Sequence, residues 1–315
     1  MDRLEMVQFT DPMCIWCYAM EPAIRKLQVL LGKQLLYHNV CGLLVSDVKQ
    51  IIGDDELADV RFAQLKTQMK GHFLEAARCS GVPVDPSWLQ EARKEDVTSL
   101  PMTLAFEAIA LQDPQRADEF LWQCRANSHG RKIIMSRREN VIRLAEQYVS
   151  DKERFLKDFD GPAAREALQK DLALCQAKGV RSYPTLELVW NGKSCLVSGY
   201  RSYDDLKAII RSLAGDALEF NQPAFTMDNV LDFIHRYGVV SGADLKLLFD
   251  LDEKQLNALI QKLAAANAVT VEPSAEVSFC TRAAPFPAKT VFALCSNRFG
   301  FSLFDSLSKS FLVYC

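Results

Sequence analysis

Two cysteines with two residues between them, set between a strand-like run and a helix-like run, constrain the fold of this chain more than any other feature. Residues 6–10 read MVQFT, which alternates and is β-prone, and Cys14 and Cys17 follow shortly after. Apolar residues then recur at helical spacing over residues 20–31, and Gly32 is a natural stop for that helix. We therefore expect Cys14 at or just before a helix N-terminus, where unpaired N–H groups and the helix dipole favour a thiolate over a thiol.

A cysteine pair of this spacing can hold a metal ion, form a structural bridge or exchange electrons with other thiols. Ten cysteines are spread over 315 residues without dense spacing, which is typical of buried thiols in a reducing compartment. A structural zinc site needs a second close pair or nearby Cys and His partners, and the four histidines are isolated. We therefore expect no metal and no other cofactor. We interpret Cys14 as the exposed nucleophile and Cys17 as the partly buried resolving thiol.

Two motifs carry a family resemblance. FTDPMCIWCYAMEP at residues 9–22 resembles the DsbA-like branch of the thioredoxin superfamily, especially its cytosolic members with a D-P-x-C-x-W-C signature. Far downstream, AKGVRSYPTLELVWNGK at residues 177–193 resembles the segment in which that superfamily carries its cis-proline. The resemblance covers about residues 5–214. It implies that Pro184 follows a cis peptide bond and starts a strand facing the two cysteines.

The resemblance also implies the site and the reaction. Cys14 and Cys17 are the expected catalytic dithiol, and the expected substrate-binding residues are Trp16, Tyr183, Pro184 and Thr185. We predict a thiol–disulfide oxidoreductase, reductase-like or isomerase-like, that acts on protein or small-molecule disulfides and is recycled by a thiol reductant. The alternative is a thioredoxin-fold adaptor, similar to those that hand a regulator to the ClpXP protease, or a redox-sensing binding protein. Hydroxychromene-carboxylate isomerases and kappa-class glutathione transferases usually have Ser at the first cysteine position, so Cys14 argues against them.

The residues between the cysteines predict a mild reduction potential. The oxidising members of the DsbA-like branch place a histidine before the second cysteine, whereas this chain has Trp16, preceded by Ile15. No Lys, Arg or His lies within six residues of Cys14 in the chain. We therefore expect a Cys14 pKa nearer ~6–7 than ~3.5. The corresponding potential is ~−270 to −200 mV, as in thioredoxin or glutaredoxin.

The expected fold class is α/β: a thioredoxin fold with an inserted helical domain, as in DsbA-like proteins, plus a small C-terminal winged-helix-like module. The two parts of the thioredoxin fold are residues 1–54, with the CxxC motif, and 161–215, with the cis-proline. Residues 55–160 form the expected inserted helical domain, because nearly all of them have helical patterning. Residues 226–280 form the expected winged-helix-like module, and residues 281–315 are a tail without clear periodicity.

Composition argues against nucleic acid and membranes as partners. The formal net charge is −3, and no apolar run approaches the ~18–20 residues of a membrane span. The first residues lack the basic and apolar regions of a secretory signal, so we expect a cytoplasmic protein. Residues 226–280 carry four Lys and Arg against eight acids, whereas a DNA-reading domain is basic. We therefore expect that module to bind a protein partner or to form a dimer.

Overall fold

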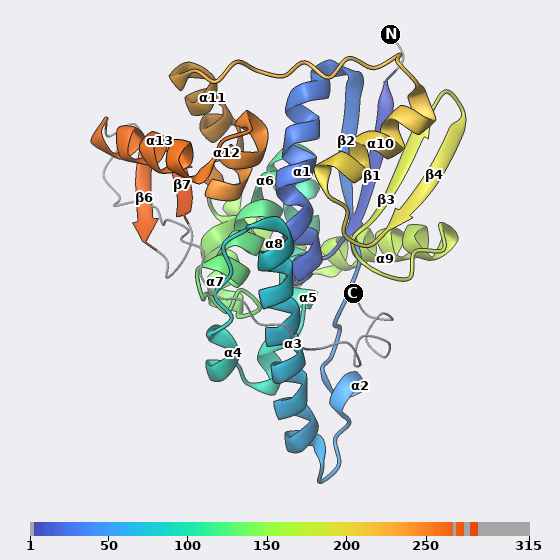
Figure 1. The fold of residues 1–315 in the computed structure, drawn as a ribbon. Helices are drawn as coiled ribbons and strands as arrows, with labels where there is room; N and C mark the ends of the chain where they lie inside the picture. The colour runs from blue at the N-terminus through green and yellow to red at the C-terminus, as the bar shows by residue number, and fades with distance from the viewer. Residues whose placement is uncertain (1–2, 267–268, 274–277, 283–315) are drawn as a thin grey trace.

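A four-stranded mixed sheet forms the centre of one half of the molecule. The computed structural model describes residues 3–266, 269–273 and 278–282. The strand order is β2-β1-β3-β4, with β1 parallel to β2 and antiparallel to β3, and β3 antiparallel to β4 (Figure 1). The strands are β1 (Leu4–Thr10), β2 (Leu35–Cys41), β3 (Thr185–Trp190) and β4 (Lys193–Ser198).

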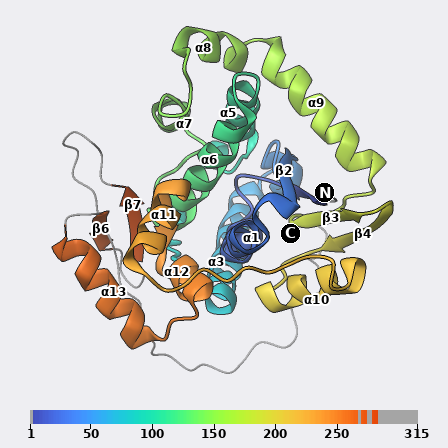
Figure 2. The same cartoon turned by 90° about the horizontal axis from the view of Figure 1, so that it is seen from above.

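Helices cover both faces of this sheet. Helix α1 (Ile15–Leu31) and helix α10 (Tyr203–Ala214) pack on one face, where Leu4 and Met6 of β1 join their apolar side chains. Helix α9 (Pro162–Ala177) lies on the other face (Figure 2). Its Cys175 packs against Phe9 and Val40. A short 3₁₀ turn, Gly32–Gln34, joins α1 to β2. This is the predicted thioredoxin topology, in which a β-α-β unit leads to a pair of antiparallel strands.

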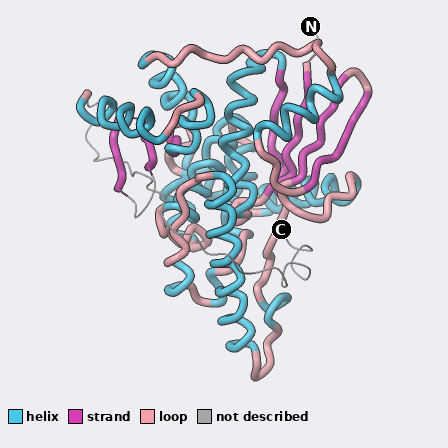
Figure 3. The backbone as a smooth tube through the Cα atoms, viewed as in Figure 1, coloured by secondary structure: helices cyan, strands magenta, loops and turns pink. Residues whose placement is uncertain are grey.

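A helical region is inserted between β2 and α9, as the patterning predicted. Figure 3 shows this region as helices joined by loops. Its apolar core includes Ile109, Phe120 and Phe155. Its elements are α2 (Lys49–Ile52), α3 (Ala58–Ser80), α4 (Trp88–Glu91), a 3₁₀ turn (Lys94–Asp96), α5 (Leu100–Ala110), α6 (Pro114–Arg125), a π-helical turn (Ala126–Gly130), α7 (Arg138–Ala145) and α8 (Lys152–Asp160).

The C-terminal region has the element order of a winged helix. It runs helix, strand, helix, helix and two strands, and its three short strands pair antiparallel in the order β5-β7-β6. The predicted tail begins inside β7, and its residues 283–315 lie outside the described part of the chain. The elements are α11 (Met227–Tyr237), β5 (Val239–Ser241), α12 (Gly242–Phe249), α13 (Glu253–Ala265), β6 (Val269–Pro273) and β7 (Ser278–Arg282).

This C-terminal module packs directly on α1, the helix that begins at the cysteine pair. One apolar core runs from the sheet through Leu27 of α1 to Leu245 of α12 and Ile234 of α11. Figures 1 and 2 both show α11 and α12 against the side of α1 that faces away from the sheet. Lys26 of α1 adds polar contacts, since its Nζ donates to Asp250 Oδ1 at 2.8 Å and to Leu247 O at 2.7 Å. Among the described residues, none of the helices combines the length and apolarity needed to cross a bilayer.

Candidate active site

The cysteine pair lies where the sequence places it, at the start of α1. Cys14 is the N-cap residue, with extended backbone, and its Sγ accepts a hydrogen bond from the N–H of Cys17 at 3.1 Å. The N–H of Cys14 donates to Asp11 O at 3.2 Å, which fixes the turn between β1 and the helix. The first cysteine therefore occupies the position where a helix N-terminus stabilises negative charge.

The expected exposure of Cys14 is wrong. Cys14 and Cys17 are both 0% exposed. The neighbours of Cys14 explain this burial, because Met13 packs into the core of the helical insertion and Ile15 packs against Phe73 of α3. The insertion thus covers the start of α1. A single sequence does not reveal this cover, because it depends on how distant helices pack over the motif.

Asp11 holds the loop before the cysteines. Its carboxylate is fully buried and accepts hydrogen bonds from Met13 N and Leu44 N, both at 2.7 Å. Burial raises the pKa of Asp11, although these hydrogen bonds and one with Ser99 oppose the shift. The side chain therefore joins the turn before α1 to the segment that follows β2.

The other predicted site residues lie on two elements. The peptide bond between Tyr183 and Pro184 is cis, as predicted. Thr185 is buried in β3 opposite Phe9 of β1. The Tyr183 ring packs so closely on Gly42 that a Cβ at residue 42 would lie 1.8 Å from Tyr183 Oη. Contacts of these residues with a substrate remain a prediction.

A cleft lies beside the half-buried Trp16. The Trp16 ring packs against Tyr200, with ring centroids 5.9 Å apart, and Tyr200 forms part of the cleft wall. The cleft has a volume of ≈ 620 Å³ and is bounded by α1, the end of α3, α12 and the start of α13. The exposed Cys79 and the charged Lys246 also line it. Trp16, which lies between the two cysteines in the sequence, thus contacts one wall of this cleft.

Sequence reasoning missed Arg125, the last residue of α6. Its guanidinium is fully buried, and Nη1 donates to Glu21 Oε1 at 2.9 Å while Nη2 donates to Asp11 O at 3.2 Å. Arg125 lies far from Cys14 along the chain, so the sequence neighbours of Cys14 do not reveal this cation. A usable signal was present, since Ala117, Leu121 and Arg125 follow one another at four-residue spacing on the buried face of α6.

The charge of Arg125 acts on the thiol pair. Burial alone would raise the pKa of the Cys17 thiol. The hydrogen bond with Cys14, the positive charge of Arg125 and further hydrogen bonds from the end of β1 outweigh burial, so the pKa of Cys17 is lowered. Because the two thiols interact, the favoured negative charge belongs to the pair.

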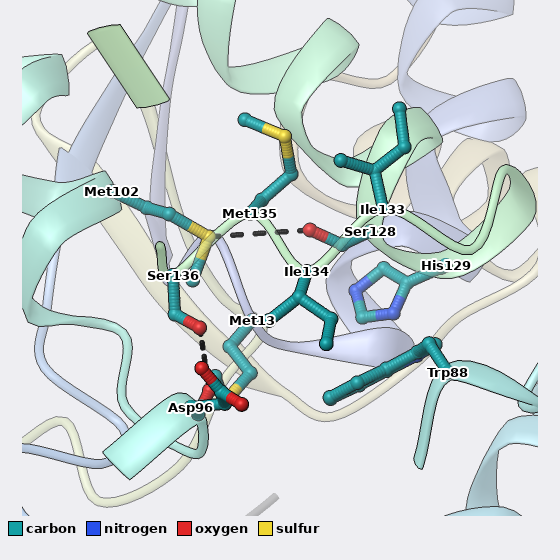
Figure 4. Close-up of a pocket in the computed structure, with 10 residues that line it drawn as sticks. All are labelled: Met13, Trp88, Asp96, Met102, Ser128, His129, Ile133, Ile134, Met135 and Ser136. Carbon is teal, nitrogen blue, oxygen red and sulfur yellow. Dashed lines mark hydrogen bonds between the residues drawn. The ribbon is translucent and has the colours of Figure 1, made fainter. Parts of the chain in front are cut away.

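A second buried polar group, His129, lies close to the loop of the cysteine motif. Its ring sits in the π-helical turn near Trp88, beside a cavity of ≈ 10 Å³ that Met13 also lines (Figure 4). Neither ring nitrogen has a hydrogen-bond partner among the described residues. Burial, and then the charge of Arg125, lower the pKa of His129 to about 3, so the ring is neutral. A cavity of this size has room for about one water molecule. Within the described part of the chain, no three His, Cys, Asp or Glu side chains are grouped to hold a metal ion.

Comparisons with known proteins agree with the thioredoxin fold. A family model described as thioredoxin matches residues 7–208. The curated relatives include the ClpXP adapter protein SpxH of Halalkalibacterium halodurans, 25% identical over 267 residues, which covers 82% of this chain and 83% of the relative. SpxH of Bacillus subtilis is also 25% identical, over 270 residues, covering 84% of this chain and 85% of the relative.

Two solved structures share the fold. A putative protein disulfide isomerase from Nitrosomonas europaea superposes with a TM-score of 0.55 at 16% identity, covering 67% of this chain and 97% of that structure. The cytosolic disulfide reductase DsbM from Pseudomonas aeruginosa superposes with a TM-score of 0.51 at 19% identity, covering 66% of this chain and 97% of that structure.

Proposed function

This chain belongs to the thioredoxin family, and from that premise we propose that it is a thiol–disulfide oxidoreductase whose Cys14 and Cys17 cycle between dithiol and disulfide. The observation that carries the proposal is the position of Cys14 as the N-cap of α1, with its Sγ accepting the N–H of Cys17 at 3.1 Å. A thiolate, and not a thiol, is the nucleophile in disulfide exchange. A helix N-terminus with a buried cation nearby supplies the conditions that a thiolate requires.

The exchange moves two electrons from the cysteine pair to a foreign disulfide. The Cys14 thiolate attacks one sulfur of that disulfide to form a mixed disulfide, and the other sulfur leaves as a thiolate that takes a proton from water. Cys17 then loses its proton and attacks Cys14 Sγ. This step forms the Cys14–Cys17 disulfide and releases the second substrate sulfur as a thiolate. Two equivalents of a thiol reductant return the pair to the dithiol.

The substrate is a protein or small-molecule disulfide that approaches through the cleft beside Trp16. The cleft combines an apolar floor, including Ala19 and Ala23 of α1, with the aromatic ring of Tyr200 and charged side chains at the α12 end. Such a surface suits an extended peptide segment, because it can contact apolar and charged side chains of the peptide at the same time. We place this activity in the cytoplasm, where thiol reductants return cysteine pairs to the dithiol form.

A redox titration tests the proposal. The protein is equilibrated with glutathione buffers of graded ratio and quenched in acid, and the thiols of the peptide containing Cys14 and Cys17 are counted by mass spectrometry. We expect a two-electron transition in that peptide, absent from the matched variant Cys14→Ser/Cys17→Ser. A pair that stays reduced or stays oxidised across all buffers, including dithiothreitol, contradicts the enzymatic function.

A second candidate is an adaptor function, and one specific observation favours it. The alignments with the two SpxH relatives cover 82% and 84% of this chain, whereas the thioredoxin family model ends at residue 208. The similarity therefore extends into the C-terminal module. The test is direct binding of the purified chain to purified ClpX, with Cys14→Ser/Cys17→Ser as the matched variant. If neither the wild-type chain nor the variant binds ClpX, the adaptor function is contradicted. If both bind ClpX, the adaptor function does not depend on the redox chemistry of the cysteine pair.

A further inference from the structure

Arg125 connects three parts of the fold through a single buried guanidinium. Besides Glu21, it contacts the end of β1, where Nη2 donates to Thr10 Oγ1 and both Nε and Nη2 donate to Asp11 O, at 3.4 and 3.2 Å. The same carbonyl of Asp11 accepts the N–H of Cys14. A displacement of Arg125 would therefore alter the turn that orients Cys14.

The charge of Arg125 is shared with a chain of buried ion pairs. Glu21 Oε2 lies 3.8 Å from Arg25 Nη2, and Arg25 Nη1 donates to Asp244 Oδ1 at 3.2 Å and to Val239 O at 3.1 Å. All four charged side chains are at most 5% exposed. These ion pairs run from the cysteine turn, along α1, to α12 of the C-terminal module.

Aromatic rings complete the enclosure of this chain. The guanidinium of Arg25 lies 4.9 Å from the ring centroid of Trp122 and 5.1 Å from that of Tyr237. Trp122 belongs to α6, the helix that ends at Arg125, and Tyr237 belongs to α11. The insertion and the C-terminal module thus hold the same ion-pair chain from two sides.

The balance of charge makes the thiol pair and Glu21 competitors for Arg125. Within the ion pairs, the cations Arg125 and Arg25 are matched by the carboxylates of Glu21 and Asp244. A thiolate therefore adds a negative charge that has no cation of its own. Burial raises the pKa of Glu21 to about 7, against the opposing charges of Arg125 and Arg25. A neutral Glu21 leaves Arg125 to face the thiolate, whereas an ionised Glu21 neutralises part of its charge.

We propose that Arg125 is a positioning residue of the redox site, which holds the Cys14 turn and stabilises the thiolate, and that Glu21 limits this stabilisation. This inference rests on the proposed thiol–disulfide function and names how this chain sets its own reactivity. The C-terminal module takes part, since Asp244 and Val239 O hold Arg25 and thereby the position of Glu21. The other titratable groups around Arg125 lie on the elements packed about it: Asp11 in the turn, Tyr37 and Cys41 on β2, Cys124 and Asp118 on α6, and the neutral His129 of the π-helical turn.

The test compares variants that change the charge in opposite directions. In Arg125→Met the thiolate loses its cation, and in Glu21→Gln the cation loses its competitor. The pH midpoint of thiolate absorbance at 240 nm is measured for the reduced proteins, with Cys14→Ser/Cys17→Ser subtracted as background. We expect the midpoint to rise by about one pH unit in Arg125→Met and to fall in Glu21→Gln, because an opposite charge a few ångströms away shifts a pKa by ~1–3 units. Arg125→Lys, which keeps the charge, should lie between wild type and Arg125→Met.

A purely structural role for Arg125 predicts no such pattern. If Arg125→Met fails to fold, the double variant Arg125→Met/Glu21→Gln removes both charges together, and circular dichroism and thermal unfolding establish that it is folded. Its midpoint should then lie above that of Glu21→Gln alone. Equal midpoints in these two variants, or shifts of one sign in both single variants, overturn the inference.

The outcome is also separable from failure of the proposed function. Thiolate absorbance requires no substrate and no turnover, so the midpoints report on Arg125 whether or not the pair exchanges disulfides. In the glutathione titration, Arg125→Met should shift the equilibrium constant up to about tenfold towards a pair that is harder to reduce. A wild-type pair without a redox transition would refute the enzyme, while opposite midpoint shifts would still support the role of Arg125.

Discussion

The sulfur atoms of Cys14 and Cys17 are fully buried, yet the proposed reaction requires contact with a foreign disulfide. Met13 and Ile15 hold the start of α1 beneath the helical insertion, so exchange requires a local opening at that contact. Local openings of this kind cost less free energy than global unfolding and are common at binding sites. At the residue scale, the reactivity of the pair therefore depends on both thiolate stability and access.

Alkylation kinetics test this dependence on access. The exposed Cys79 is the internal comparison, although burial, followed by Glu75, raises the pKa of its thiol. With iodoacetamide under native conditions, we expect Cys79 to be modified at least about tenfold faster than Cys14, because only a rare open state exposes Cys14. Peptide mapping by mass spectrometry over time measures both rates, and Cys79→Ser is the control for the fast phase. A Cys14 that reacts first would mean that the motif is open in solution.

At the scale of elements, local signals predicted much of the fold, and contacts between distant segments account for what they missed. Apolar spacing and Gly32 predicted the helix after Cys17. The resemblance of residues 177–193 to the cis-proline segment of the thioredoxin superfamily predicted the cis bond before Pro184. The cover over Cys14 and the cation Arg125 depend on how α3 and α6 pack against α1, which helical periodicity alone does not specify. The buried face of α6 could have been predicted from the spacing of its residues. The segments that pack against that face could not.

Helices α5 and α9 carry a testable pH dependence. Burial, and then the charge of Asp171 on α9, raise the pKa of Glu107 on α5 to about 8. The unfolded chain releases this proton near pH 4.5, so the folded state holds one more proton between about pH 4.5 and 8. The contribution of Glu107 to stability therefore falls as pH rises through this window. We expect Glu107→Gln to remove this loss and to stabilise the protein at pH 8 by on the order of 2 kcal/mol.

Urea unfolding at pH 5 and pH 8 measures the effect of Glu107→Gln. The matched control is Glu56→Gln, an exposed carboxylate on a turn before α3, for which the pH dependence should remain that of wild type. An unchanged difference in unfolding free energy between pH 5 and pH 8 for Glu107→Gln would show that another group carries the dependence.

At the scale of the whole molecule, the C-terminal module and the thioredoxin fold share one core and one chain of buried charges. The apolar core continues from Met6 of the sheet to Leu263 of α13. Two of the acids in residues 226–280 form ion pairs with α1, which explains part of the acidic character of this module. Asp244 pairs with Arg25, and Asp250 pairs with Lys26. The module therefore uses part of its negative charge within the chain, at the helix that begins with the redox pair.

The pair between Arg25 and Asp244 should therefore contribute to the stability of the whole chain. Both side chains are about 5% exposed, and removing one partner of a buried pair leaves the other charge uncompensated. Asp244 Oδ2 also accepts the N–H of Ser241 at 2.6 Å at the start of α12, so the substitution weakens that helix end as well. We expect Asp244→Asn to lower the unfolding free energy by on the order of 3 kcal/mol.

Denaturant unfolding, followed by the fluorescence of the tryptophans, measures this loss. The control is Asp216→Asn, whose partner Arg211 lies 2.9 Å away but whose side chain is fully exposed. That variant should unfold as wild type does, because exposed ion pairs are screened by water and salt. If the module were an independent unit, Asp244→Asn would produce a separate early transition while the thioredoxin fold kept its own midpoint. A single transition shifted to lower denaturant is what a continuous core and a shared ion-pair chain require.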